Sequence, residues 1–442
     1  TNADGAKLTG AGVSDGVAIV TASEGEFRFG ELMASKAVAG AKLKAILTSS
    51  SLSSLSNAFD VTSDAKGTTY YVSNQGNDAN DGKSPERAWA SVAKVNASKY
   101  VAGDGVLFRG GDTFNGCLLF NQKNVPNTTE DAGITISAYG QGKFQLNATC
   151  SGFQPDGNGV AAIQITQLSG VTITNAILRG AQGKADGTTY GILLYNPYQP
   201  AAVMKNIKIM DNDIGGFYTV QPKKYGGEIF WSVYYQTKTS IDYLLISGNK
   251  LHGLQGPSSP DNNGIMGIAQ LPVISHATIE KNVVYDIGGK ANGLAGVEGN
   301  GIVGMGLNGA VIRHNVAHDL GGNANTCGGP GGIWLVQANN ATIEKNEVYR
   351  VRPTSMPIAG ACDWIGYDMD YSVTNSYIQY NYSHDNWGPG LLFYGKHNWG
   401  PNVARYNVSI NDGKASNGRA PITASLAIGG EAGTKMFLSV YN

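Results

Sequence analysis

The stretch Ala277-Thr278-Ile279-Glu280-Lys281-Asn282-Val283-Val284-Tyr285-Asp286 decides the fold, because similar stretches return along the chain at 310–319, 341–350 and 376–385. In each copy, alternating apolar and polar residues run into an Asn, and a second short alternation follows. Alternation with a period of two is typical of β-strands rather than helices.

The corner Asn residues give the period of the repeat. They are Asn147, Asn175, Asn212, Asn249, Asn282, Asn315, Asn346, Asn381 and Asn407, with successive differences of 28, 37, 37, 33, 33, 31, 35 and 26. Repeats of this length predict a solenoid. Asn tolerates the left-handed backbone of a tight corner, and stacked Asn side chains can bond to one another. We therefore predict an all-β parallel solenoid of about ten coils with an asparagine ladder.

Composition excludes several other classes. The 442 residues include 61 Gly, only 15% are charged, and the net charge is −1, which argues against nucleic acid or an anionic membrane as partner. No apolar run reaches the roughly 18 residues of a membrane span. No signal peptide is visible at Thr1, which fits either a mature secreted form or a product trimmed at its initiator Met.

Residues 1–66 differ from the repeats, since they are rich in Ala, Gly and Ser. Apolar residues at rough helical spacing predict a helix from Glu31 to Leu47, and Ser49 to Asn57 is a linker-type tract. Too small to bury much core alone, this segment is either a poorly ordered leader or an attachment and oligomerisation module.

The start of the repeats carries a resemblance. It contains Tyr70-Tyr71-Val72-Ser73, the turn-rich run 77–82, a predicted short helix from Glu86 to Val95, and a strand with flanking glycines over 103–114. This opening resembles that of right-handed parallel β-helix proteins that act on polysaccharides, the pectate-lyase-like superfamily. Over residues 69–442 the resemblance implies a right-handed, single-stranded β-helix with a β-helix start and capping helix at 67–114 and coils at 115–442. A helix over the solenoid end would cover its unpaired strand edge.

Asp78, Asn80 and Asp81 offer clustered oxygens of the kind that Ca²⁺ binds. The spacing of a helix-loop-helix calcium loop is absent, and the alternative is a loop of Asx-turns. No cofactor is required by the sequence, and Ca²⁺ is a candidate only.

A third strand in each coil starts with Gly. Examples are Gly191–Tyr195, Gly264–Met266, Gly301–Met305, Gly332–Val336, Gly366–Asp370 and Gly390–Tyr394. We expect these strands to form one parallel sheet, with loops of variable length before them that build binding walls.

A column of aromatic rings is predicted three residues after successive corner Asn residues, at His252, Tyr285, His318, Tyr349 and His384. The favoured interpretation is a stabilising stack on an outer face, and the alternative is a surface that grips sugar rings.

Cys327 and Cys362 each lie 19 residues before a corner Asn, so a disulfide between adjacent coils is possible. Cys117 and Cys150 have different offsets, so no pairing is predicted for them, and no compartment follows from cysteine content. Thr434–Asn442 is expected to be a strand that runs into a further corner Asn, from which we expect that the protein continues beyond this chain.

The candidate catalytic residues are Asp368 and Asp370, assisted by Asp363. They occupy outward places where neighbouring third strands carry Trp334 and Val336, or Leu392 and Tyr394. Residues two apart on a strand share a face about 6.5–7 Å apart, close enough for mutual repulsion to raise one pKa. A raised acid beside an ionised base is what glycoside hydrolysis needs, and the resemblance places glycosidase acids on this kind of sheet. The alternative is a solvated acidic pair.

The candidate sugar-binding residues are Trp334, Trp364, Tyr394, His397 and Trp399. A second enzyme hypothesis is a polysaccharide lyase, with Lys396 and His397 near the base position. A third is a non-catalytic glycan-binding fibre.

The separate N-terminal segment resembles the layout of a phage tailspike. That resemblance implies a homotrimeric depolymerase located on a virion or extracellularly, with an N-terminal segment that binds a virion or surface protein. The alternative is a secreted bacterial protein.

Overall fold

The computed structural model describes residues 67–150, 160–180, 189–197, 202–219, 225–233, 240–269, 271–289, 298–324, 329–355, 363–414 and 424–441, together with short strands before residue 67. The chain divides into two units, Thr1–Lys66 and Gly67–Asn442.

The first unit contains short antiparallel strands. They are β1 (Leu8–Thr9), β2 (Val13–Ser14), β3 (Val17–Ala18), β4 (Met33–Ala34), β5 (Val38–Ala41), β6 (Lys44–Ile46), β7 (Ser53–Leu55) and β8 (Phe59–Val61), paired β1–β4, β2–β3, β5–β8 and β6–β7. The helix predicted from Glu31 to Leu47 is wrong, because β4, β5 and β6 occupy it. Gly40 and the β-branched Val38 both lower helix propensity there.

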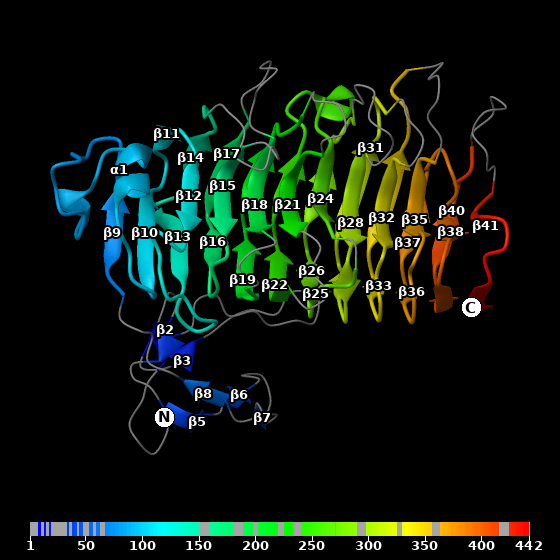
Figure 1. Cartoon of the computed structure of the whole chain (residues 1–442), viewed down its shortest axis with the longest axis horizontal. Coiled ribbons are helices and arrows are strands. Elements are labelled where there is room, and N and C mark those ends of the chain that lie inside the picture. Colours follow the sequence, from blue (N-terminus) through cyan, green and yellow to red (C-terminus); the bar gives the residue numbers. More distant parts are fainter. Residues whose placement is uncertain are drawn as a thin grey trace. The chain divides into compact units, whose positions relative to one another are not determined.

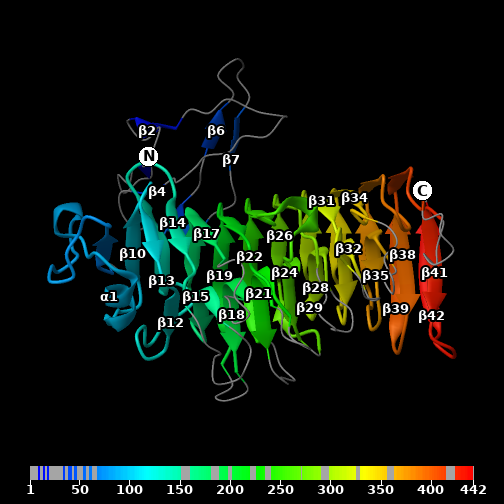
Figure 2. The same cartoon turned by 90° about the horizontal axis from the view of Figure 1, so that it is seen from above.

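The second unit is a parallel β-helix whose strands stack in three sheets (Figures 1 and 2). The first sheet contains β9 (Thr69–Val72), β10 (Asp104–Arg109), β13 (Ile134–Tyr139), β16 (Thr172–Thr174), β19 (Met204–Met210), β22 (Ile241–Ser247), β26 (Thr278–Glu280), β30 (Val311–Arg313), β33 (Thr342–Glu344), β36 (Tyr377–Gln379), β39 (Trp399–Arg405) and β42 (Met436–Tyr441), with β25 (Ile274–Ser275) and β29 (Leu307–Asn308) beside β22.

Each of the other two sheets has ten strands among the described residues. The second sheet contains β11 (Thr113–Asn115), β14 (Phe144–Asn147), β17 (Ala176–Arg179), β20 (Asp213–Gly215), β23 (Lys250–His252), β27 (Val283–Tyr285), β31 (Val316–Leu320), β34 (Glu347–Val351), β37 (Tyr382–His384) and β40 (Val408–Ile410). The third contains β12 (Leu118–Asn121), β15 (Ala161–Thr166), β18 (Tyr190–Asn196), β21 (Gly227–Val233), β24 (Asn263–Ile268), β28 (Asn300–Met305), β32 (Gly331–Val336), β35 (Ile365–Met369), β38 (Leu391–Gly395) and β41 (Leu426–Gly430).

The predicted alternation decides which side chains enter the core. Ile279, Ile312, Ile343 and Ile378 lie in register in adjacent strands of the first sheet and are fully buried, with partly exposed or exposed residues on either side. Stacking like side chains about 4.8 Å apart buries a continuous core that no single coil could form. The predicted parallel solenoid is confirmed.

The asparagine ladder is confirmed from Asn212 to Asn407. Each side-chain Oδ1 accepts hydrogen bonds from the backbone N–H and side-chain Nδ2 of the previous ladder Asn, at 2.9–3.1 Å. The members are Asn212, Asn249, Asn282, Asn315, Asn346, Asn381 and Asn407. From Asn212 to Asn381, the backbone N–H and the side-chain Nδ2 of each ladder Asn therefore both have a partner in the next ladder Asn.

Two predicted members lie outside the ladder. The backbone N–H of Ala176, not Asn175, donates to Asn212 Oδ1 at 3.0 Å, and Asn147 instead pairs with Asn115 across the second sheet. The left-handed residue is also the one before the ladder Asn, as at Lys281 with φ 57°. Asn175 has φ 58°, so it occupies that preceding position, and the prediction was displaced by one residue there.

The N-terminal end of the β-helix has less helix than predicted. The 3₁₀ turn η1 (Pro85–Arg87) and the six-residue α1 (Val92–Ala97) replace the helix expected over 86–95, so the capping helix is not confirmed. A second 3₁₀ turn, η2 (Gly256–Ser258), lies between β23 and β24. Ser91 begins α1 by accepting a hydrogen bond from the Lys94 N–H, which satisfies one of the free donors at the helix start.

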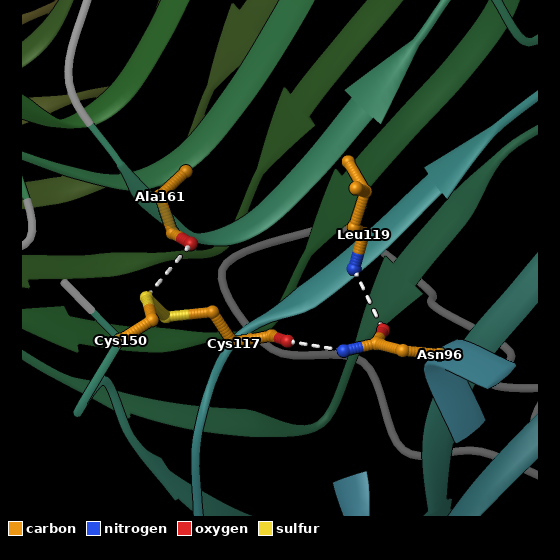
Figure 3. The surroundings of a disulfide bond; sticks show 5 residues. All are labelled: Asn96, Cys117, Leu119, Cys150 and Ala161. Atoms are coloured by element: carbon orange, nitrogen blue, oxygen red, sulfur yellow. Dashed lines mark hydrogen bonds between the residues drawn. A yellow bond between two sulfur atoms is a disulfide. The ribbon is translucent and has the colours of Figure 1, made fainter. Parts of the chain in front are cut away.

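A disulfide joins Cys117 and Cys150, whose Cα atoms are 5.7 Å apart (Figure 3). Asn96 of α1 donates to the Cys117 carbonyl and accepts from the Leu119 N–H, so the same segment also holds α1 in place. The sequence did not predict this pairing. The predicted partners Cys327 and Cys362 lie outside the described residues, as does Asn442, although β42 confirms the strand expected before it.

The aromatic column is confirmed as a stack on the second sheet. Successive rings from His252 to His384 are nearly parallel, with centroids 4.8–5.3 Å apart. Both faces of each internal ring are therefore covered by its two neighbours, and mainly the ring edges are left for solvent. This arrangement favours the stabilising role. Among the described residues, no helix is long and apolar enough to cross a membrane.

Candidate active site

The outer face of the third sheet carries the candidate acids. Its interior side chains, such as Leu335 and Met369, join the main core, whereas Trp334 and Val336 belong to a separate apolar cluster on the other face. Asp368 lies in register between Trp334 on β32 and Leu392 on β38. The predicted facing of these strands is therefore correct, and Asp368 and Asp370 share the outer face.

Asp368 and Asp370 lie among tightly packed side chains. Asp368 is only 4% exposed, and its Oδ1 has no hydrogen-bond partner. Asp370 retains some exposed surface, and its Oδ1 accepts a 2.8 Å hydrogen bond from the Tyr371 N–H. An unpartnered carboxyl oxygen in such a place is costly to bury, which is typical of a site kept for chemistry rather than stability.

Burial, with repulsion from neighbouring carboxyls, raises the pKa values of both groups. Burial is the largest cause of the rise in the pKa of Asp368 well above its ordinary range, and the charges of Asp370 and Asp363 add to it. Burial likewise raises the pKa of Asp370 to about 7, although the Tyr371 N–H and the Lys396 charge oppose the rise. The pair therefore holds at least one proton near neutral pH, as an acid–base pair requires.

Asp363 lies two residues before β35 and is partly exposed. Its backbone has φ 81°, a left-handed conformation that is uncommon for a residue with a side chain. Its charge contributes to the raised pKa values of both Asp368 and Asp370, so the three predicted carboxyls do lie near one another.

Only some of the predicted aromatic residues remain candidates for sugar contact. Trp364 and Trp399 are 3% and 2% exposed, belong to the main core, and donate their indole N–H groups to backbone carbonyls. Their core packing contradicts the predicted sugar contacts, because their ring faces are covered by other side chains. Asp363 and Trp364 both have a left-handed backbone just before β35, with φ 81° and 48°, and Trp364 packs into the core. Regular strand alternation does not predict this position.

Tyr394 and His397 are exposed, and Tyr394 is 37% accessible. Trp334 is on the outer face but buried, with its indole N–H donated to Asn300 Oδ1 at 3.0 Å. These three positions therefore differ in accessibility, and Tyr394 and His397 are the most open to a ligand.

Further acids, missed by the sequence analysis, lie at the starts of other third strands. Glu228 and Asp261 are buried side by side, and burial together with their proximity raises the pKa of Glu228 well above its ordinary range. Burial also raises the pKa of Asp261, so the two carboxyls share a proton. Glu298 is 4% exposed, and burial raises its pKa to about 7. The sequence did contain a sign of Glu228, because it lies at the strand position where the neighbouring coils have Gly191 and Gly264.

The side chains of the calcium candidates form hydrogen bonds within their own loop. Asp78 accepts from the N–H groups of Ala90 and Ser91, Asp81 accepts from the Lys83 N–H and pairs with Arg87, and Asn80 donates to Ala88. Over the described part of the chain, no group of three or more His, Cys, Asp or Glu side chains is arranged to hold a metal.

A hollow of about 460 Å³ lies beside the second sheet, lined in part by Asp319, Arg350, Trp387 and Lys414. Hydrogen bonds from Arg350 and His318 hold the pKa of Asp319 far below its ordinary range despite burial. A carboxylate held so firmly ionised is a poor proton donor or acceptor, so this hollow is a weaker catalytic candidate than the third sheet.

Comparison with known proteins agrees with the fold. The family model "Right handed beta helix region" matches residues 232–424. A lacto-N-biosidase of Bifidobacterium longum subsp. longum is 31% identical over 232 residues, which are 52% of this chain but only 12% of that protein. The chain thus spans a small part of that relative.

Among solved structures, the GH136 lacto-N-biosidase from Eubacterium ramulus aligns with a TM-score of 0.56 at 18% identity, covering 85% of this chain and 68% of that one. Pectate lyase Pel9A aligns over 85% of this chain and 77% of its own, with a TM-score of 0.40 at 13% identity. The expected right-handed parallel β-helix fold is confirmed.

Proposed function

We propose that this protein is a glycoside hydrolase that cleaves an oligosaccharide or polysaccharide on the outer face of its third sheet. The observation that carries the proposal is the buried carboxyl pair Asp368 and Asp370, in which repulsion and burial keep a proton near neutral pH. Asp363 stands beside them at the start of the same strand.

Asp368, the more deeply buried group, acts as general acid and protonates the glycosidic oxygen as the bond to the anomeric carbon breaks. Asp370 acts as general base, removing a proton from the water that attacks that carbon, and Asp363 helps to orient the water. The Cα atoms of residues two apart on a strand lie about 6.5–7 Å apart, so side chains that run parallel would hold the two carboxyl groups at the lower end of the range of inverting glycosidases. We therefore propose inversion at the anomeric carbon.

The comparisons support hydrolysis over elimination, because a relative at 31% identity is a lacto-N-biosidase. Of the two residues proposed near the lyase base position, Lys396 pairs with Glu431 at 2.7 Å, whereas His397 remains exposed. The Cys117–Cys150 disulfide supports an extracellular location, because disulfides persist in oxidising compartments. The tailspike setting, the homotrimer, virion binding by residues 1–66 and Ca²⁺ as a candidate ligand stay predictions, testable by light scattering and metal titration.

The test is a cleavage assay on p-nitrophenyl lacto-N-bioside, neutral polysaccharides such as xylan and galactan, and polyuronates such as pectate and alginate. Release of reducing ends or nitrophenol, without the ultraviolet absorbance of unsaturated uronates, would support hydrolysis. Unsaturated products would instead make the protein a lyase. Glycan binding without any product would leave a binding fibre.

A further inference from the structure

One position is acidic in several coils at the start of the third-sheet strands. Asn263 pairs with Asn300, Ile302 with Ile333, and Gly331 with Ile365. Counting back along each strand from these partners places Asp261, Glu298, Gly329 and Asp363 in register. Glu298 and Asp363 are then two coils apart, about 9–10 Å, and Gly329 places no side chain between them.

Glu298 is unusual among these acids because neither of its side-chain oxygens has a hydrogen-bond partner among the described residues. It is only 4% exposed. Glu228 and Asp261 interact with each other, although one oxygen of each also lacks a partner, whereas neither oxygen of Glu298 has a partner among the described residues. Leaving two buried acceptor atoms unmet costs free energy that a ligand with suitable donors would recover.

Several contacts connect Glu298 to the face that holds Asp370. Tyr225 and Tyr371 both pack against the outer cluster of Trp334 and Val336. The charge of Glu298 contributes to the raised pKa of Tyr225, while Tyr225 and the charge of Asp370 both contribute to that of Tyr371. The chain from Glu298 through these two tyrosines to Asp370 therefore runs along one face.

A second buried polar group without a partner in the described part of the chain lies on the neighbouring coil, at Asn262. Asn262 is 1% exposed and its side-chain Nδ2 has no acceptor. Its carbonyl accepts a 2.6 Å hydrogen bond from the N–H of Gly299, the residue after Glu298. The unpartnered side-chain oxygens of Glu298 match the hydroxyl groups of a sugar, which donate hydrogen bonds.

We propose that Glu298 is a substrate-anchoring residue, whose carboxylate accepts hydrogen bonds from paired hydroxyl groups of a neutral sugar unit bound beside the Asp363–Asp370 site. This subsite rests on the proposed function for its role in cleavage, although binding alone can be measured without it. Glu298 contacts the sugar away from the reacting bond, so it affects affinity rather than the chemical step.

The experiment compares Glu298→Ala and Glu298→Gln with wild type on the neutral glycan of the panel that wild type cleaves fastest. Glu344→Gln, on the first sheet, makes the same chemical change where Gln379 is the partner and serves as control. We expect KM to rise about ten- to a hundredfold in Glu298→Ala, from the loss of charged hydrogen bonds, while kcat changes little. Glu344→Gln should match wild type.

The pH dependence of KM separates an anchor from a merely structural residue. Because the pKa of Glu298 is raised to about 7, the carboxylate forms only above neutral pH, and it accepts hydroxyl hydrogen bonds more strongly than the protonated acid. Wild-type KM should therefore fall as pH rises through 7. In Glu298→Gln this step should be absent.

An unchanged KM in Glu298→Ala, with wild type active, overturns the anchor but leaves hydrolysis standing. If wild type cleaves nothing, calorimetric titration of the same neutral glycans decides: binding weakened by Glu298→Ala supports the anchor without the enzyme. Binding that is absent, or indifferent to Glu298→Ala, overturns the anchor.

Discussion

At the scale of residues, Asp368 and Asp370 show a conflict between stability and chemistry. Packing Asp368 between Trp334 and Leu392 removes water that would stabilise its charge, so the protein holds it protonated instead. Asn at either place would fill nearly the same volume without that conflict. Two acids only two residues apart in such surroundings are best explained by a role in proton transfer during catalysis.

This conflict predicts a pH-dependent stability. Because the folded-state pKa of Asp370 is raised to about 7, the unfolded chain ionises first as pH rises above the ordinary Asp range. The contribution of Asp370 to stability is therefore full below about pH 4 and is lost by about pH 8. Calorimetry should show Asp368→Asn/Asp370→Asn melting above wild type at pH 8, with little difference at pH 4.

Asp385 offers a control of opposite sign. A hydrogen bond with His384 lowers its pKa, so its contribution to stability is gained as pH rises through the acid range. Asp385→Asn should melt at or below wild type at pH 8. A difference between wild type and the double variant that does not change with pH would contradict the raised pKa values.

At the scale of elements, the asparagine ladder sets the corner between the first and second sheets. Asn282 shows the arrangement, because its Nδ2 donates to the Ile246 carbonyl and to Asn315 Oδ1. Its own Oδ1 accepts from the backbone N–H and the Nδ2 of Asn249. Removing one side chain would break bonds to both neighbouring coils and leave buried donors and acceptors unmet.

We therefore expect Asn282→Ala to lower the free energy of unfolding by about 2–4 kcal/mol, measured by urea denaturation. Asn147→Ala is the matched control, because Asn147 pairs only with nearby side chains at a partly exposed place. It should cost under about 1 kcal/mol. Equal losses in both variants would show that the ladder contributes nothing special.

Elements with regular alternation could be predicted from the sequence, and irregular ones could not. The β-strands around Asn282 repeat the same pattern in coil after coil. The sequence therefore correctly predicted which side chains point outward, including that of Asp368. Alternation is broken within β32, where Gly332 and Ile333 both face the interior, and the core position of Trp364 just before β35 was likewise not visible in the sequence. Glu298 was not visible either, because its neighbours come from coils distant in sequence.

At the scale of the whole molecule, the Cys117–Cys150 disulfide closes a loop of 33 residues at the first coils. Sequence spacing could not predict this disulfide. The asparagine ladder gives the register of the later coils, and it does not extend to these early coils. Cys117→Ser/Cys150→Ser should lower the free energy of unfolding by about 2–4 kcal/mol. Denaturation with and without reductant checks this, since reductant should destabilise wild type and leave the variant unchanged.

The central claim is that Asp368 and Asp370 together hydrolyse a glycosidic bond. The most direct measurement is the rate of reducing-end release by Asp370→Asn beside wild type on the best panel substrate. We expect a loss of about 10²–10⁴-fold in kcat with folding retained, as for a general acid or base. Hydrolysis at the wild-type rate by the folded variant would contradict the account.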